Sequence, residues 1–157
     1  MIGEDNTWIV YWNDYTADTY LYGSEIEFHS KDNIEFHNDR MPAGTVIKRW
    51  YSKTQFQAQR IEPSLPIIDG ENRYELIIDM DVPENELFLF RIVFYDKYEL
   101  EAGFVNIRDI VTEFKCPLKT YSYQIELING GLSHFNFHKM IIRDITDESE
   151  EYTAKTE

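Results

Sequence analysis

Hydrophobic and polar residues alternate along most of this chain and do not recur at helical spacing. Alternation of this kind indicates half-buried strands of antiparallel sheets. It is clearest in three stretches, residues 26–36, 74–80 and 121–127. In the first stretch, two alternating runs flank the polar segment Ser30-Lys31-Asp32-Asn33. We therefore predict a β-hairpin there, with one face turned to solvent.

Further strands are predicted at 8–12, 46–51, 87–95 and from Phe135 to about Ile145. The stretch 87–95 is apolar on both faces apart from Arg91, which places it in the middle of a sheet. Residues 108–115 fit a helix or another strand. Turn residues recur every ten residues or so, which gives about eight to ten short strands. The pattern predicts an all-β fold, an antiparallel β-sandwich of jelly-roll type.

The composition fits one folded domain followed by a short tail. The 157 residues suffice for a single core, and 43% hydrophobic with 15% aromatic residues is too apolar for a disordered chain. After Thr146 the chain turns polar and acidic, with little to bury. We predict a sandwich domain over 1–146 and a disordered acidic tail over 147–157.

The net charge of −14 argues against nucleic acid or an anionic membrane surface as the partner. Cys116 is the single cysteine, so no disulfide can form within the chain. Residues 1–12 carry acidic groups where a secretory signal has positive charge, and no stretch reaches about 18 apolar residues. A cytoplasmic protein is expected.

The sequence patterns that would indicate catalytic or metal-binding residues are weak. His134 and His138 are four apart, which spans about 13 Å on a strand, too far for shared zinc ligation. Cys116 and the serines lack a recognisable nucleophile motif. Pairs of neighbouring carboxylates, as a glycosidase would need, are explained by the alternation of polar residues on the solvent face of a strand. The loop 69–72 is a polar turn with a calcium site as its alternative. We expect no enzyme activity and no cofactor, leaving a cupin-type metalloenzyme as a remote alternative.

The aromatic surplus is the most informative feature for function. Tyr and Trp side chains near strand ends can anchor a protein interface or stack on sugars. We predict that five such residues bind a partner: Trp12, Tyr20, Tyr22, Trp50 and Tyr51. Tyr20 and Tyr22 are the foremost candidates, because they alternate before a Gly-Ser turn and so leave on one face.

Four ordered segments resemble the smallest component of the accessory Sec secretion system, accessory secretory protein three. The matching residues are Thr19 to Ser24, Met41 to Ile47 with Trp50, Pro63 to Pro66 with Gly70 and Tyr74, and Tyr121 to Asn129 with Gly131 and Phe137. The resemblance runs from about Trp8 to Ile145. Lys48-Arg49 and the acidic tail depart from the family pattern.

The resemblance implies a non-enzymatic protein of Gram-positive bacteria with a fold similar to carbohydrate-binding modules. It implies a cytoplasmic export complex, peripheral at the membrane, that helps secrete a serine-rich repeat glycoprotein adhesin. The implied partners are a glycosyltransferase-like first component, an acetyltransferase-like second component, the accessory Sec motor ATPase and the adhesin. The alternative function is a free-standing carbohydrate-binding module.

Overall fold

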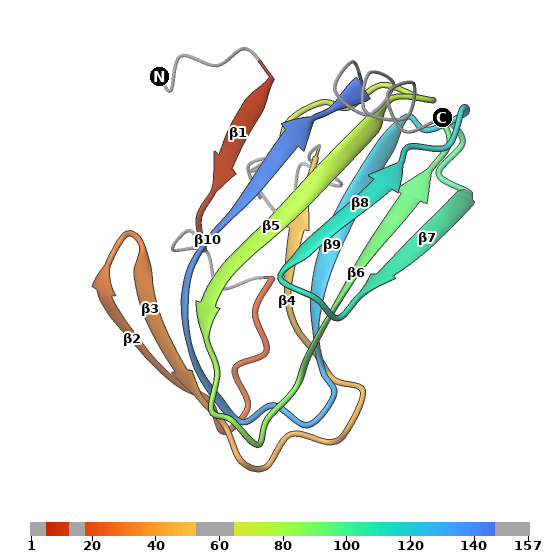
Figure 1. Ribbon diagram of the computed structural model, residues 1–157. Helices are drawn as coiled ribbons and strands as arrows, with labels where there is room; N and C mark the ends of the chain where they lie inside the picture. The colour runs from red at the N-terminus through yellow and green to blue at the C-terminus, as the bar shows by residue number, and fades with distance from the viewer. Residues whose placement is uncertain (1–5, 13–17, 53–64, 147–157) are drawn as a thin grey trace.

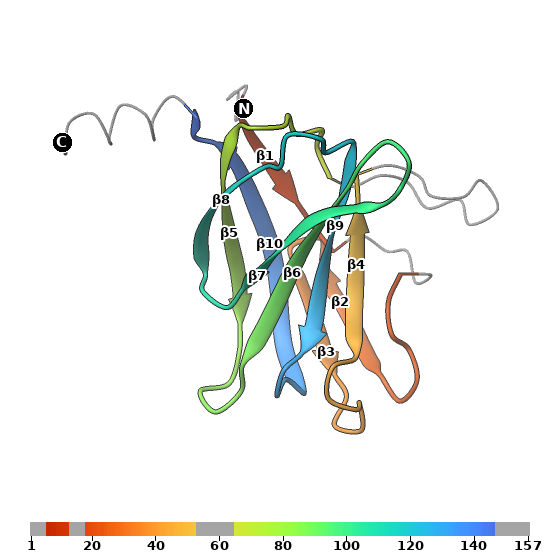
Figure 2. The same cartoon turned by 90° about the vertical axis from the view of Figure 1, so that its right-hand side faces the viewer.

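The computed structural model describes residues 6–12, 18–52 and 65–146. Their elements are ten strands, which form two antiparallel sheets packed face to face (Figures 1 and 2). The strands are β1 Thr7–Val10, β2 Glu25–Ser30, β3 Asn33–His37, β4 Val46–Tyr51, β5 Arg73–Asp81, β6 Phe88–Tyr95, β7 Glu101–Ile107, β8 Val111–Lys115, β9 Ser122–Asn129 and β10 His134–Asp144.

The first sheet has the order β2-β3-β10-β5-β8, and β1 also pairs with β10. The second sheet has the order β4-β9-β6-β7. The all-β antiparallel sandwich predicted from the sequence is thus confirmed, and the ambiguous stretch 108–115 contains a strand, β8. The predicted hairpin is β2-β3, with Ile26 opposite Phe36 and Phe28 opposite Ile34.

The stretch 87–95 was expected in the middle of a sheet, and β6 does lie between β9 and β7. Its first residue departs from the expectation, because Leu87 precedes the strand and is 67% exposed. The strand covered along its whole length is β9, where all eight residues are buried. The alternating sequence of β9 predicts one solvent-facing side, so burial there reflects packing that the pattern alone does not reveal.

Aromatic rings fill the space between the sheets, and two predicted surface residues belong to this core. Trp12 and Trp50 are 1% and 0% exposed, with ring centroids 5.9 Å apart in an edge contact. Trp12 lies two residues beyond Val10 and keeps its inward direction, while the Trp50 indole N–H donates to the Tyr11 carbonyl at 3.0 Å. The expectation that these two rings stay exposed near strand ends is wrong, because both continue the inward-facing alternation.

Within the described ranges, no helix is long and apolar enough to span a membrane. The predicted acidic tail, 147–157, lies outside the described residues.

Candidate partner-binding surface

The three tyrosines predicted to bind a partner lie in two different places. Tyr22 is 79% exposed, and Tyr20 is half-buried beside β4, where its backbone N–H donates to the Ile47 carbonyl at 2.8 Å. Tyr51 is half-buried at the far end of β4, opposite Gln124 of β9. The structure therefore brings Tyr20 and Tyr22 into one turn and separates Tyr51 from them.

The turn formed by residues 20–24, the Tyr22 turn, is held by hydrogen bonds on both sides. The Ser24 hydroxyl donates to the Tyr20 carbonyl at 2.7 Å, and the amide of buried Asn38 donates to the Tyr22 carbonyl at 2.8 Å. Gly23 adopts φ +77°, a conformation that glycine reaches without strain. An exposed ring on a fixed turn loses little conformational freedom when it binds.

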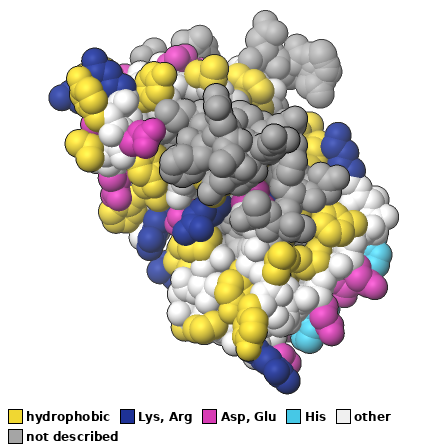
Figure 3. All heavy atoms as spheres, turned by 180° about the vertical axis from the view of Figure 1, so that it is seen from behind, with side chains coloured by type: hydrophobic (Ala, Val, Ile, Leu, Met, Phe, Trp, Pro, Cys, Tyr) yellow, Lys and Arg dark blue, Asp and Glu magenta, His cyan; other side chains and the backbone are white. Residues whose placement is uncertain are grey.

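A larger apolar surface lies at the opposite end of the sandwich. The antiparallel register places Ser122 beside Tyr95 at that end, whereas Asn129, near the Tyr22 turn, lies at the other. Five exposed hydrophobic side chains lie on three loops at this end, and we name them the Tyr121 patch: Ile67, Tyr98, Leu100, Leu118 and Tyr121. Figure 3 shows hydrophobic side chains beside Lys and Arg at its upper left, the end where β6 joins β7 and β8 joins β9.

Two open hollows flank Tyr121. One, of about 410 Å³, is lined by Ile67 and Ile68 together with Tyr123. The other, of about 500 Å³, is lined by Tyr98, Leu118 and two lysines, Lys97 and Lys119. Thr120 and Tyr121 contribute to both hollows. An exposed ring between two apolar hollows is the arrangement in which aromatic anchors from two proteins interlock.

The loops that carry the Tyr121 patch are fixed by short hydrogen bonds. The Asp96 carboxylate accepts the backbone N–H groups of Tyr98 at 2.8 Å and Leu100 at 3.0 Å. The backbone N–H of Tyr121 donates to the Tyr95 carbonyl at 2.7 Å, which ties the β8–β9 loop to β6. These contacts present the patch as a preformed surface.

Most residues of the Tyr121 patch are not predicted from the sequence. Tyr121 belongs to the general aromatic surplus, but Tyr98 and Leu118 lie in turns and Ile67 lies outside the strands. A signal does exist, because turns are usually polar and an apolar side chain within Asp96–Leu100 or directly after Pro117 has no strand face to fill. What no pattern reveals is that the three loops meet.

The candidate catalytic and metal-binding residues contact other groups of the protein. His134 and His138 contact different carboxylates, Glu35 and Asp81, each at 2.9 Å, so this pair does not converge on one point. Burial raises the pKa of the Cys116 thiol, which disfavours the nucleophilic thiolate. In the loop 69–72, the Glu71 carboxylate pairs with Lys115 at 3.0 Å.

The two packed antiparallel sheets define a β-sandwich of the carbohydrate-binding-module type. The solved CBM22-1 xylan-binding domain from Paenibacillus barcinonensis superposes with a TM-score of 0.51 at 10% identity, covering 88% of this chain and 94% of that one. Residues 19–144 match the family model of the accessory Sec secretory system that describes its accessory secretory protein 3. The chain belongs to this family, which confirms the resemblance read from its motifs.

Individual relatives agree with the family match. The accessory Sec system protein of this family from Streptococcus gordonii is 36% identical over 131 residues, 83% of this chain and 82% of the relative. A chain of the Glycosylation Associate Protein (Gap123) complex from Streptococcus agalactiae superposes with a TM-score of 0.82 at 30% identity, covering 90% of this chain but only 46% of that one. A chain from the crystal structure of accessory secretory proteins 1, 2 and 3 of Streptococcus pneumoniae has a TM-score of 0.81 at 23% identity, covering 92% and 99%.

Proposed function

We propose that this chain is a non-enzymatic adaptor of the accessory Sec export complex, working on the cytoplasmic side in secretion of a serine-rich repeat glycoprotein adhesin. Its partners in this proposal are the glycosyltransferase-like first and acetyltransferase-like second accessory proteins, the motor ATPase and the adhesin. Family membership supports the proposal, and so do the Gap123 complex and the structure of accessory secretory proteins 1, 2 and 3, each of which contains a chain of this fold.

The observation that carries the proposal is the Tyr121 patch. Five exposed hydrophobic side chains on hydrogen-bonded loops form a partner surface, since exposed apolar clusters of this kind mark interaction sites. The Tyr22 turn offers a second, smaller surface at the other end of the sandwich. Two surfaces so far apart suit a protein that contacts two partners at once, as an adaptor does.

The test is a binding measurement with the first and second accessory proteins, purified together. Replacing two rings of the patch, Tyr98→Ala with Tyr121→Ala, should weaken binding by about 30-fold or more, which corresponds to about 2 kcal/mol. The matched control is Phe104→Ala, which removes a 55% exposed ring from β7 and should bind like the parent. Equal affinity of the double variant and the parent would contradict the assignment of this surface.

The Tyr22 turn is tested separately with Tyr20→Ala combined with Tyr22→Ala. The proposal expects this variant to lose about 2 kcal/mol of binding to one of the partners while keeping its fold. Because Tyr20 is half-buried, its replacement can also disturb packing. Tyr22→Ala alone removes only an exposed ring and therefore reports on binding without that effect. Unchanged binding to every partner would leave the Tyr22 turn without a role.

The fold similarity to carbohydrate-binding modules supports a second candidate, direct binding of glycan on the adhesin. Titration with a serine-rich repeat peptide, with and without its sugars, separates the two functions. The adaptor proposal expects the accessory proteins to bind far more tightly than free sugars. Tight binding to isolated sugars together with no binding to the accessory proteins would favour the carbohydrate-binding module.

A further inference from the structure

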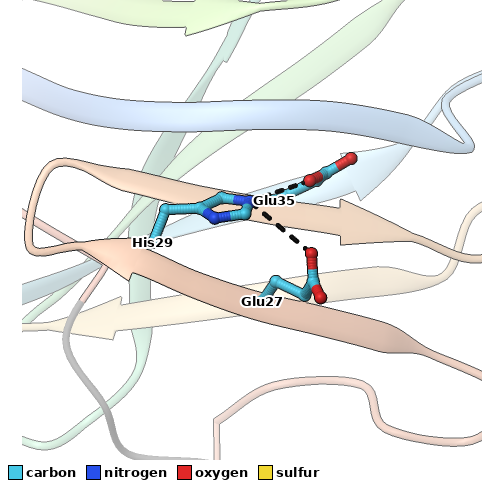
Figure 4. Close-up of side chains that lie close together, drawn as sticks. All are labelled: Glu27, His29 and Glu35. Carbon is cyan, nitrogen blue, oxygen red and sulfur yellow. Dashed lines mark hydrogen bonds and ion pairs between the residues drawn. The ribbon is translucent and has the colours of Figure 1, made fainter.

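The solvent face of the β2-β3 hairpin gathers one histidine and two glutamates from its two strands. Glu27 and Glu35 lie directly opposite each other, a like-charge pair that on its own destabilises a sheet. His29 Nε2 lies 2.9 Å from a Glu35 oxygen and 3.6 Å from a Glu27 oxygen (Figure 4). The potential ligand atoms of the three side chains all lie within 4.8 Å of one another.

Glu27 and His29 are two residues apart on β2 and therefore share the outer face of the hairpin, where a bulge also changes the direction of His29. The register shifts between Phe28 and Ser30, so His29 is the extra residue of β2 and has no partner opposite on β3. Bulges of this kind redirect a side chain. Here the imidazole extends along the outer face toward Glu35, instead of following the strand toward the turn.

We infer that Glu27, His29 and Glu35 form a binding site for a divalent transition-metal ion of the zinc class. A tetrahedral ion with bonds of about 2.1 Å holds its ligands about 3.4 Å apart, and small side-chain rotations bring the three ligand atoms to that spacing. An imidazole with two carboxylates suits zinc, copper or nickel, whereas calcium and magnesium favour oxygen ligands alone. Water or a partner side chain completes the coordination.

A neighbouring strand supports this geometry. The second oxygen of Glu35 contacts His134 Nε2 of β10 at 2.9 Å, which leaves the first oxygen directed at His29. Hydrogen bonds from neighbouring groups commonly orient a ligating carboxylate. His134 is thus a positioning residue, and the ion would join β2, the edge strand of the first sheet, to β3 and through Glu35 to β10.

The test is calorimetric titration of the purified chain with zinc sulfate alone. We expect saturable binding of one ion. His29→Ala and Glu35→Gln should each lower the zinc affinity at least tenfold, and His134→Gln should lower it less. His37→Gln is the matched control, because His37 occupies the same face beside Glu25, at 3.5 Å, outside the cluster. That control should bind within about twofold of the parent.

Thermal unfolding gives an independent measurement, since an ion that binds the folded state raises the melting temperature with concentration. The shift should disappear in His29→Ala and persist in His37→Gln. Glu27 and His29 are exposed and Glu35 is half-buried, so the variants should fold, and Glu27→Gln replaces any that does not. No saturable zinc binding, an equal loss in His37→Gln, or calcium bound as tightly as zinc would each overturn the inference.

Discussion

At the scale of single residues, the most unusual side chain is Lys48, which points into the core. Its side chain is 0% exposed, and its ammonium group contacts the carboxylate of Asp18, whose side chain is 1% exposed, at 2.7 Å. The ammonium also lies 5.0 Å from the ring of Trp12 and 5.6 Å from that of Trp50. Burial lowers the pKa of Lys48, and the carboxylate of Asp18 opposes that shift.

Removing the carboxylate should destabilise the fold strongly, because it leaves a buried ammonium without its counter-charge. We expect Asp18→Asn to lower the free energy of unfolding by about 3–5 kcal/mol in urea denaturation. The control is Glu71→Gln, which breaks the exposed pair with Lys115 at 3.0 Å and should change stability by less than about 1 kcal/mol. Similar losses in both variants would contradict the buried role of Lys48.

His138 joins the hairpin turn to β5. It is the extra residue of a second bulge, its Nδ1 contacts the Asp32 carbonyl at 2.7 Å, and its Nε2 contacts the Asp81 carboxylate at 2.9 Å. Two acceptors favour the imidazolium, and the hydrogen bond to Asp81 is the main cause that raises the pKa of His138. Asp79 adds to the rise through its charge.

A raised pKa of His138 makes this contact depend on pH in a defined direction. Its stabilising contribution is fully present below the unfolded pKa of about 6.5 and is lost as pH rises through the higher folded pKa. The stability difference between the parent and His138→Gln should therefore be larger at about pH 6 than at about pH 9. Denaturant unfolding at the two values measures it, and a difference that grows with pH would be the contrary result.

At the scale of elements, alternation made the strands predictable and left the loops open. The strands β3 and β5 follow from side-chain period alone, because each has one buried face. The prediction that Trp12 and Trp50 are exposed is wrong, because the position of a residue in the inward-outward alternation of a strand, and not its distance from a turn, sets the direction of its side chain. The surface that Tyr98 forms with Leu118 and Tyr121 depends on contacts between loops distant in sequence, which no local pattern encodes.

The meeting of two loops at Gly70 illustrates that dependence. A Cβ atom at this position would lie 2.4 Å from the Leu118 backbone carbonyl oxygen, closer than real contacts allow. Gly70→Ala should therefore push the segment 65–72 away from the β8–β9 loop and lower stability by about 1–3 kcal/mol. The control is Gly130→Ala, whose Cβ would have ordinary contact at 3.7 Å with Leu89. Equal stability of the Gly70 variant and the parent would show that the loops yield freely.

At the scale of the whole molecule, the sandwich keeps two candidate surfaces apart on loops at its opposite ends. The sequence predicted the fold and the family, because these depend on periodicity and motifs. It did not identify the Tyr121 patch, because Ile67, Leu118 and Tyr121 come from separate loops that only the folded sheets bring together. The contact of Glu35 with His134 was hidden for the same reason, since these two residues come together only through the pairing of β3 with β10.

We expect this family member to bind its accessory partners through the Tyr121 patch. Amide hydrogen exchange of the intact chain, free and in complex with the first and second accessory proteins, tests it most directly. Binding should protect residues 96–100 and 118–121, while the exposed face of β8, around Val111, should exchange as in the free protein. Protection confined to sheet faces, with unchanged exchange in both loops, would contradict it.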